Sequence, residues 1–141
     1  IQNNVPVIGV INDFLNHKLY FARKGGGAYC NEEIIKTSTV TKKNKGTLVT
    51  GIPARESYTE DDFRNIISQF QDWKKVRMIG SATIANILVA TGSADMYRED
   101  GIFFWDIAAG SVIVQEAGGI ARITNFYDDY RVDAEFTNGN F

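Results

Sequence analysis

The sequence predicts a mixed α/β protein in which layers of helix and sheet share one core. Strand-like and helix-like segments alternate along the chain without repeats or low-complexity stretches, which favours an α/β or layered α+β sandwich. A chain of 141 residues can bury one sizeable core. No internal linker divides it, so we expect a single domain over residues 1–141.

The chain begins with a predicted hairpin. Val5–Ile11 and Lys18–Ala22 are the expected strands, and the polar loop between them holds His17, which we interpret as a solvated turn residue. The glycine-rich segment 23–31 begins with two basic residues and could cradle a phosphate with its backbone amides. It lacks the Gly-Lys-Ser/Thr of a P-loop, so a glycine-rich bend of the sheet is the better interpretation.

The middle of the chain predicts further strands and an amphipathic helix. Ile34–Val40 is a candidate edge strand, and Thr47–Thr50 is a candidate buried strand that breaks at residues 51–53. Thr59 has the position of a helix N-cap, with Asp62 three residues later. The apolar stripe of this helix, which we expect to face the core, comprises Phe63, Ile66, Ile67, Phe70 and Trp73.

A second helix is predicted to begin at Gly80-Ser81-Ala82 and to end at Gly92. The free amides at such a helix start suit an anion such as phosphate. An ordinary N-cap at Ser81 is the alternative, and the residues alone favour it. The remaining strands are expected at Val76–Met78, Ala94–Tyr97, Ile120–Thr124 and Glu135–Thr137.

The segment from Glu99 to Gly119 combines carboxylates with a buried helix. Its residues are apolar on almost every side from Asp106, the expected helix start, to the expected stop at Gly118-Gly119. Carboxylates near an anion site suit Mg²⁺, which is held by one or two of them together with substrate phosphates. From the residues alone, Asp106 is either a ligand or a plain helix cap, and Glu99 and Asp100 are either site residues or solvated loop charges.

Composition excludes several functions. A net charge of -2 without a Lys/Arg cluster gives no electrostatic footprint for nucleic acid. One cysteine excludes disulfide frameworks and cysteine-rich zinc sites. No apolar run suits a membrane span and no secretory signal opens the chain, so we expect a cytoplasmic protein. Because the first residue is Ile1, we expect a processed or truncated piece of a longer product.

Several motifs together resemble one known family. Trp105-Asp106-Ile107-Ala108-Ala109-Gly110, continued by Glu116-Ala117-Gly118-Gly119, closely resembles the second signature of the inositol monophosphatase family. Segments 80–97 and 22–31 resemble the helix, strand and hairpin end of that family. Thr50-Gly51-Ile52-Pro53 and Asn138-Gly139 are similar to its Thr-Gly-Phe-Pro and Asn-Gly motifs, so the resemblance covers essentially the whole chain.

The resemblance implies the alternating helix–sheet fold shared with fructose bisphosphatases and a Mg²⁺-dependent phosphatase that acts on small phosphorylated metabolites. By position, Asp106 would be a ligand of one catalytic Mg²⁺, and Glu99 would hydrogen-bond a substrate hydroxyl. Gly80, Ser81 and Ala82 would line the substrate and phosphate side. Phe103 departs from the members that carry a histidine there, and Ile52 stands near a polar serine of some eukaryotic members.

The family's first signature, Asp-Pro-x-Asp-Gly-Thr, which supplies most metal ligands, is absent from this sequence. The resemblance therefore implies the C-terminal half of a phosphomonoesterase for inositol monophosphate or a related sugar phosphate, with no complete catalytic set, inactive alone and forming a homodimer when whole. The alternatives are a non-catalytic binding or assembly module that retains the scaffold, and a fructose bisphosphatase or nucleotide 3′-phosphatase relative.

Overall fold

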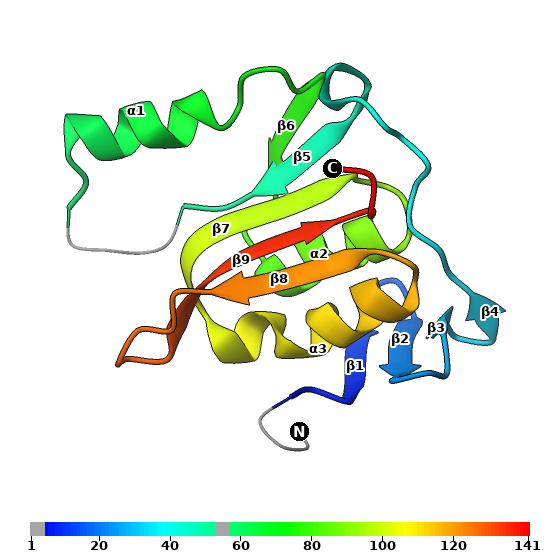
Figure 1. Cartoon of the computed structure of the whole chain (residues 1–141). Coiled ribbons are helices and arrows are strands. Elements are labelled where there is room, and N and C mark those ends of the chain that lie inside the picture. Colours follow the sequence, from blue (N-terminus) through cyan, green and yellow to red (C-terminus); the bar gives the residue numbers. More distant parts are fainter. Residues whose placement is uncertain (1–4, 53–56) are drawn as a thin grey trace.

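The computed structural model describes residues 5–52 and 57–141, in which helix α3 (Phe104–Glu116) lies between two β-sheets, with helix α2 (Ala82–Ala90) beside it (Figure 1). The predicted mixed α/β class is confirmed. The antiparallel sheet, in order, comprises β1 (Ile8–Asp13), β2 (Lys18–Arg23), β3 (Ala28–Cys30) and β4 (Glu33–Ile34). The other sheet, in order, comprises β6 (Lys75–Met78), β5 (Thr47–Thr50), β7 (Met96–Phe103), β9 (Arg131–Thr137) and β8 (Ile120–Thr124).

The five-stranded sheet is parallel on one side and antiparallel on the other. Strand β5 pairs in parallel with both β6 and β7, whereas β9 pairs antiparallel with both β7 and β8. The chain therefore leaves β5, β6 and β7 at the same edge of the sheet. That edge is where α2 and α3 begin, since α2 follows β6 and α3 follows β7 directly.

Helix α3 contacts both sheets, which explains why its sequence has no wide polar face. Ile107, Ile113 and Val114 are fully buried within it. Its contact with α2 depends on Gly110, because a Cβ there would lie 2.6 Å from Cβ of Asn86 on α2. Asn86 is itself fully buried, and its amide has no hydrogen-bond partner among the described residues. The absence of a side chain at Gly110 thus sets how closely the two helices approach.

The amphipathic helix is shorter and more exposed than the sequence predicts. Helix α1 (Glu60–Ser68) has the expected capping box between Thr59 and Asp62. The expectation that its apolar stripe is core is wrong: Phe63 is 49% exposed and Ile67 is 56% exposed. The reason is its position, because α1 lies apart from the layers that hold the core (Figure 1). In the part of the chain that the structure describes, no helix is long and apolar enough to cross a membrane.

The predicted edge strand at Ile34–Val40 is mostly irregular, since β4 stops at Ile34. Side chains take the place of a strand ladder here: Ser38 donates to the buried Asp95, and Nδ2 of Asn138 donates to the carbonyl of Val40 at 2.8 Å. These bonds hold the segment against the end of the five-stranded sheet without pairing it. The expected break after β5 includes Pro53, which lies outside the described residues.

Three elements near the candidate site residues have other ends than the sequence predicts. Strand β7 continues to Phe103, so Glu99 lies in a strand rather than a loop, opposite Ala134 of β9. Helix α3 begins at Phe104, so Asp106 is not the helix start. Strand β9 begins at Arg131, whose backbone pairs with Phe103. Hydrogen bonding between β7 and β9 makes both strands longer than the segments predicted from the sequence, Ala94–Tyr97 and Glu135–Thr137.

The outer face of the four-stranded sheet carries a row of apolar side chains. Val10 pairs with Phe21, which pairs with Tyr29, and the two rings stack with centroids 5.4 Å apart. Val10 is 55% exposed, and Ile34, opposite Tyr29, is 65% exposed. Such contiguous exposed apolar surface typically marks an interaction face. His17 lies in the exposed turn between β1 and β2, as predicted.

We predict that the isolated chain self-associates through this face. Replacing Val10 and Phe21 together by lysine should shift it toward monomer, because charge on the apolar row opposes its burial between copies. Analytical ultracentrifugation at several concentrations measures the change. Phe14→Lys is the control, because Phe14 is also an exposed apolar residue but lies in the neighbouring turn. A monodisperse monomer of the unaltered chain would contradict the prediction.

We also predict that Gly110→Ala destabilises the fold by about 2 kcal/mol, because its Cβ would overlap Asn86 between two packed helices. Urea denaturation measures the loss. Ala109→Gly is a control on the same turn of α3. Ala109 is half-buried, and glycine there should lower the free energy of unfolding by about 1 kcal/mol through its lower helix propensity alone. Equal stability of Gly110→Ala and the unaltered chain would show that the helices do not depend on this close contact.

Candidate active site

A cleft lies at the edge of the sheet where the three parallel strands end. Gly51 follows β5, Gly80 lies shortly after β6, and Glu99 is on β7. Together with the first turns of α2 and α3, these segments surround a cavity of about 420 Å³. The carboxyl ends of parallel strands are the usual position of ligand sites in α/β sheets.

All five residues that the sequence singled out line this one cleft: Gly80, Ser81, Ala82, Glu99 and Asp106. They come from three elements that follow one another in the chain, α2, β7 and α3. The arrangement brings a helix N-terminus and two carboxylates together. Such a site can bind an anion and a hydroxyl-bearing or cation-bearing group at the same time.

Ser81 is the N-cap of α2. Its hydroxyl oxygen accepts a hydrogen bond from the amide of Ile84 at 3.4 Å, so the ordinary capping role expected for serine is present. The amides at the first positions of a helix have no acceptor within the helix. Those of Ala82 and Thr83 are at this position, in residues that line the cleft. The cap and an anion site at the helix start are therefore compatible.

Glu99 is buried at 8% exposure, and its carboxylate accepts a hydrogen bond from the hydroxyl of Tyr97 at 3.0 Å. Burial raises the pKa of Glu99, the bond from Tyr97 lowers it, and the neighbouring charges of Asp106 and Asp100 raise it. The same burial raises the pKa of Tyr97 well above its usual range, so the phenol keeps its proton and acts as the donor.

Asp106 lies in the first turn of α3, where a carboxylate is favoured by the helix dipole. Phe103 is the N-cap residue, and it provides no side-chain cap. Within the part of the chain that the structure describes, no hydrogen bond engages the Asp106 carboxylate, whereas its backbone carbonyl accepts one from Thr83 at 3.0 Å. The interpretation of Asp106 as a plain helix cap is therefore wrong. Asp106 lines the cleft, and its carboxylate accepts no hydrogen bond from the described residues.

Sequence reasoning missed several residues of the cleft. Arg131 reaches it through the β7–β9 pairing, and its guanidinium lies 5.2 Å from the ring centre of Phe103. Thr50 also lines it and donates to the carbonyl of Arg98 at 2.6 Å. Tyr97 could have been found, because strand residues two apart share a face and Glu99 was already singled out. No sequence signal identifies Arg131.

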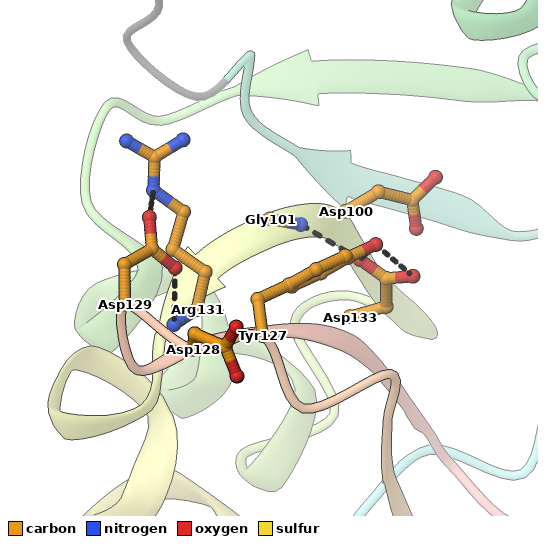
Figure 2. A pocket seen from close by; sticks show the side chains of 7 residues that line it. All are labelled: Asp100, Gly101, Tyr127, Asp128, Asp129, Arg131 and Asp133. Carbon is orange, nitrogen blue, oxygen red and sulfur yellow. Dashed lines mark hydrogen bonds and ion pairs between the residues drawn. The ribbon is translucent and has the colours of Figure 1, made fainter.

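A second, acidic pocket of about 480 Å³ lies next to the cleft, around the loop between β8 and β9 (Figure 2). Two of its carboxylates, those of Asp133 and Asp129, are engaged by neighbouring groups. Asp133 accepts from the amide of Gly101 at 2.8 Å, and Asp129 pairs with Nε of Arg131 at 3.1 Å (Figure 2). Asp133 also accepts from the hydroxyl of Tyr127 at 3.3 Å. Asp133 thus joins the loop residue Tyr127 to Gly101 of β7.

The cleft offers oxygen ligands but few of them. Over residues 5–52 and 57–141, no three His, Cys, Asp or Glu side chains are grouped closely enough to hold a metal ion. Mg²⁺ binds through one or two carboxylates completed by water and substrate phosphate, so Asp106 alone fits such an ion as one of its ligands. Further protein ligands would have to come from outside the described residues.

The backbone amides of the glycine-rich segment bind a carboxylate of the protein itself, that of Glu116. The two carboxylate oxygens of Glu116, at the end of α3, accept hydrogen bonds from the amides of Gly25 at 2.8 Å and Gly27 at 2.9 Å. These bonds lower the pKa of Glu116. The backbone cradle considered for phosphate is thus filled by a side chain, which agrees with its interpretation as a bend of the sheet.

Comparisons of the sequence and of the structure with known proteins point to the same family. The model of the inositol monophosphatase family matches residues 1–129. The chain belongs to the inositol monophosphatase family. Rat inositol monophosphatase 2 is 39% identical over 120 residues, which are 83% of this chain and 41% of that protein. Human inositol monophosphatase 1 is 38% identical over 117 residues, 79% of this chain and 42% of that protein. The chain thus spans less than half of these two curated relatives.

Solved structures of family members agree with the fold. The inositol monophosphatase from Anabaena (Nostoc) sp. PCC 7120 superposes with a TM-score of 0.86 at 32% identity, covering 98% of this chain and 56% of that one. Mycobacterium tuberculosis SuhB superposes with a TM-score of 0.85 at 26% identity, covering 97% of this chain and 56% of that one. The predicted inositol monophosphatase-like fold is therefore confirmed.

The Glu116 contact predicts a pH-dependent contribution to stability. Because the folded-state pKa lies below the unfolded value of about 4.3, the stabilisation is complete above that value and is lost as pH falls through the folded pKa. We expect Glu116→Gln to cost about 1 kcal/mol at pH 7, and less as the pH falls below about 4.

Urea denaturation at a series of pH values measures this difference. Glu32→Gln is the control, because it removes the same charge from an exposed residue of the same sheet region. A cost for Glu116→Gln that does not change between pH 7 and pH 3 would show that the ionised carboxylate is not the stabilising form.

Proposed function

We propose that this chain supplies the C-terminal half of the active site of a Mg²⁺-dependent phosphomonoesterase acting on inositol monophosphate or a related small sugar phosphate. The observation that carries the proposal is the convergence of Asp106, Glu99 and the start of α2 on one cleft. Membership of the inositol monophosphatase family supports the reaction class.

In this proposal the substrate phosphate binds at the N-terminus of α2. The amides of Ala82 and Thr83 would donate to phosphate oxygens, and the partial positive charge of the helix start would favour the anion. Gly80 and Ser81 are exposed at this position, so substrate can approach without displacing a side chain. The helix start orients the ester so that its alcohol portion extends toward Glu99.

Asp106 would hold one Mg²⁺ through its carboxylate, which has no protein donor among the described residues. When bound, the ion supplies charge neutralisation at the phosphate and acidifies a coordinated water. Asp106 contributes a fixed negative charge on a rigid helix turn, and Thr83 links that turn to the start of α2. The two helix starts therefore keep a constant spacing between the phosphate site and the carboxylate.

Glu99 would accept a hydrogen bond from a hydroxyl of the substrate's polyol. Burial reduces competition from water at this carboxylate, which strengthens the bond. Phe103 and Ile52 also line the cleft, where the resemblance implies a histidine at position 103 in some members and a serine near position 52 in others. We propose that these apolar positions adjust which sugar phosphate is preferred.

The chain would work with an N-terminal half that supplies the remaining metal ligands, and the whole protein would form a homodimer in the cytoplasm. We expect the chain alone to be inactive, because one carboxylate cannot hold the ions that the reaction needs. The exposed apolar row on the four-stranded sheet supports the expectation that a further part of the protein covers this chain.

The test is complementation. The chain, mixed with an N-terminal half that contains Asp-Pro-x-Asp-Gly-Thr, should release phosphate from inositol monophosphate only when Mg²⁺ is added. Asp106→Asn should reduce that rate by at least about tenfold, since even outer-shell partners of metal ligands contribute this much. Phosphate release is measured colorimetrically.

Asp128→Asn is the matched control, because Asp128 lies in the adjacent acidic pocket rather than in the cleft (Figure 2). It should leave the rate unchanged. An unaltered rate in Asp106→Asn would overturn the ligand role, and the absence of Mg²⁺-dependent release from the complemented protein would overturn the proposed function.

A further inference from the structure

Two residues enclose the carboxylate of Glu99. Tyr97, two positions earlier on β7, is fully buried and donates its hydroxyl to Oε2 of Glu99 at 3.0 Å. Gly51, which follows β5, faces the same carboxylate: a Cβ at Gly51 would lie 2.7 Å from Cδ and 2.8 Å from Oε1 of Glu99. The carboxylate therefore fits only because position 51 has no side chain.

The remaining contacts of these residues fix them in turn. The ring of Tyr97 packs edge-on against Phe136 of β9, with centroids 5.8 Å apart. Gly51 continues from β5, whose Thr50 pairs with Arg98, the residue between Tyr97 and Glu99. Tyr97 thus belongs to the sheet, and Gly51 directly follows one of its strands.

One oxygen of Glu99 remains available. Among the described residues no donor reaches Oε1 of Glu99. This oxygen is also not completely buried. Glu99 lines the cleft together with Tyr97 and Gly51. A hydroxyl in the cleft can therefore donate to Oε1 while Tyr97 keeps Oε2.

We infer that Tyr97 is a positioning residue for substrate selection: its hydroxyl holds one carboxylate oxygen of Glu99 against Gly51 so that the other accepts a hydroxyl of the polyol. This inference rests on the proposed function for the role of Glu99, whereas the contact between Tyr97 and Glu99 stands by itself. A carboxylate held in one orientation loses less side-chain entropy when substrate binds, so the selectivity for hydroxyl-bearing esters depends on Tyr97 as well as on Glu99.

The first experiment uses the chain alone. Carbon-13 NMR follows the side-chain carboxyl signal of Glu99 through a pH titration with a chelator present, and the signal is assigned by its loss in Glu99→Gln. Tyr97→Phe keeps the ring and removes the donor to the ionised carboxylate, so the pKa of Glu99 should rise by about one unit. Tyr29→Phe, on the other sheet, is the control and should not shift it. An unchanged pKa in Tyr97→Phe would overturn the contact.

The second experiment compares two esters in the complemented protein. For inositol monophosphate, Tyr97→Phe should lower kcat/KM about fivefold to tenfold. For para-nitrophenyl phosphate, which has no polyol hydroxyl, kcat/KM should be unchanged. Gly51→Ala, whose added Cβ would displace the carboxylate, should have the same selective effect. In a Glu99→Gln background, Tyr97→Phe should cause no further loss.

Equal losses on both esters would assign Tyr97 a purely structural role and overturn the inference, as would an unchanged rate on inositol monophosphate. Failure of the unaltered complemented protein to hydrolyse either ester would count against the proposed function instead. In that case the titration of the chain alone still decides whether Tyr97 holds Glu99.

Discussion

The structure depends on one buried helix that is packed on both of its sides. Because α3 lies between two sheets, it must be apolar around its circumference, and at Gly110 it must have no side chain if α2 is to approach. This close contact fixes the starts of α2 and α3 relative to each other. The cleft is the space in front of those two starts, so packing in the core determines the spacing of the groups that face substrate.

The cleft combines rigid backbone with a small number of polar groups. The helix start supplies amides, α3 supplies the carboxylate of Asp106, and β7 supplies Glu99 between Tyr97 and Gly51. Asp106, Glu99 and Tyr97 lie on regular elements, and Gly51 directly follows β5. The loop between β8 and β9 contributes indirectly, because it engages the backbone of Arg131 beside Phe103.

The sequence predicted the fold class and most elements, and it singled out five residues that line one cleft, because apolar periodicity, capping residues and family motifs are local signals. It failed where tertiary contacts decide. The apolar stripe on α1 is periodic, but no sheet or helix of the described residues covers it. Ile34–Val40 is held mainly by side-chain hydrogen bonds rather than by pairing with another strand. Arg131 reaches the cleft only because β9 pairs with β7, and no local pattern reports that register.

The clamp of Glu116 on the glycine-rich bend joins segments that lie 91 residues apart in the sequence. A carboxylate at the C-terminal end of a helix is unfavourable with the helix dipole, so its bonds to two amides offset that cost. The bend and the last turn of α3 consequently cannot open independently, because either movement leaves the carboxylate unpaired. They form one cooperative unit for local unfolding, which ties the edge of the first sheet to the helix that carries Asp106 at its other end.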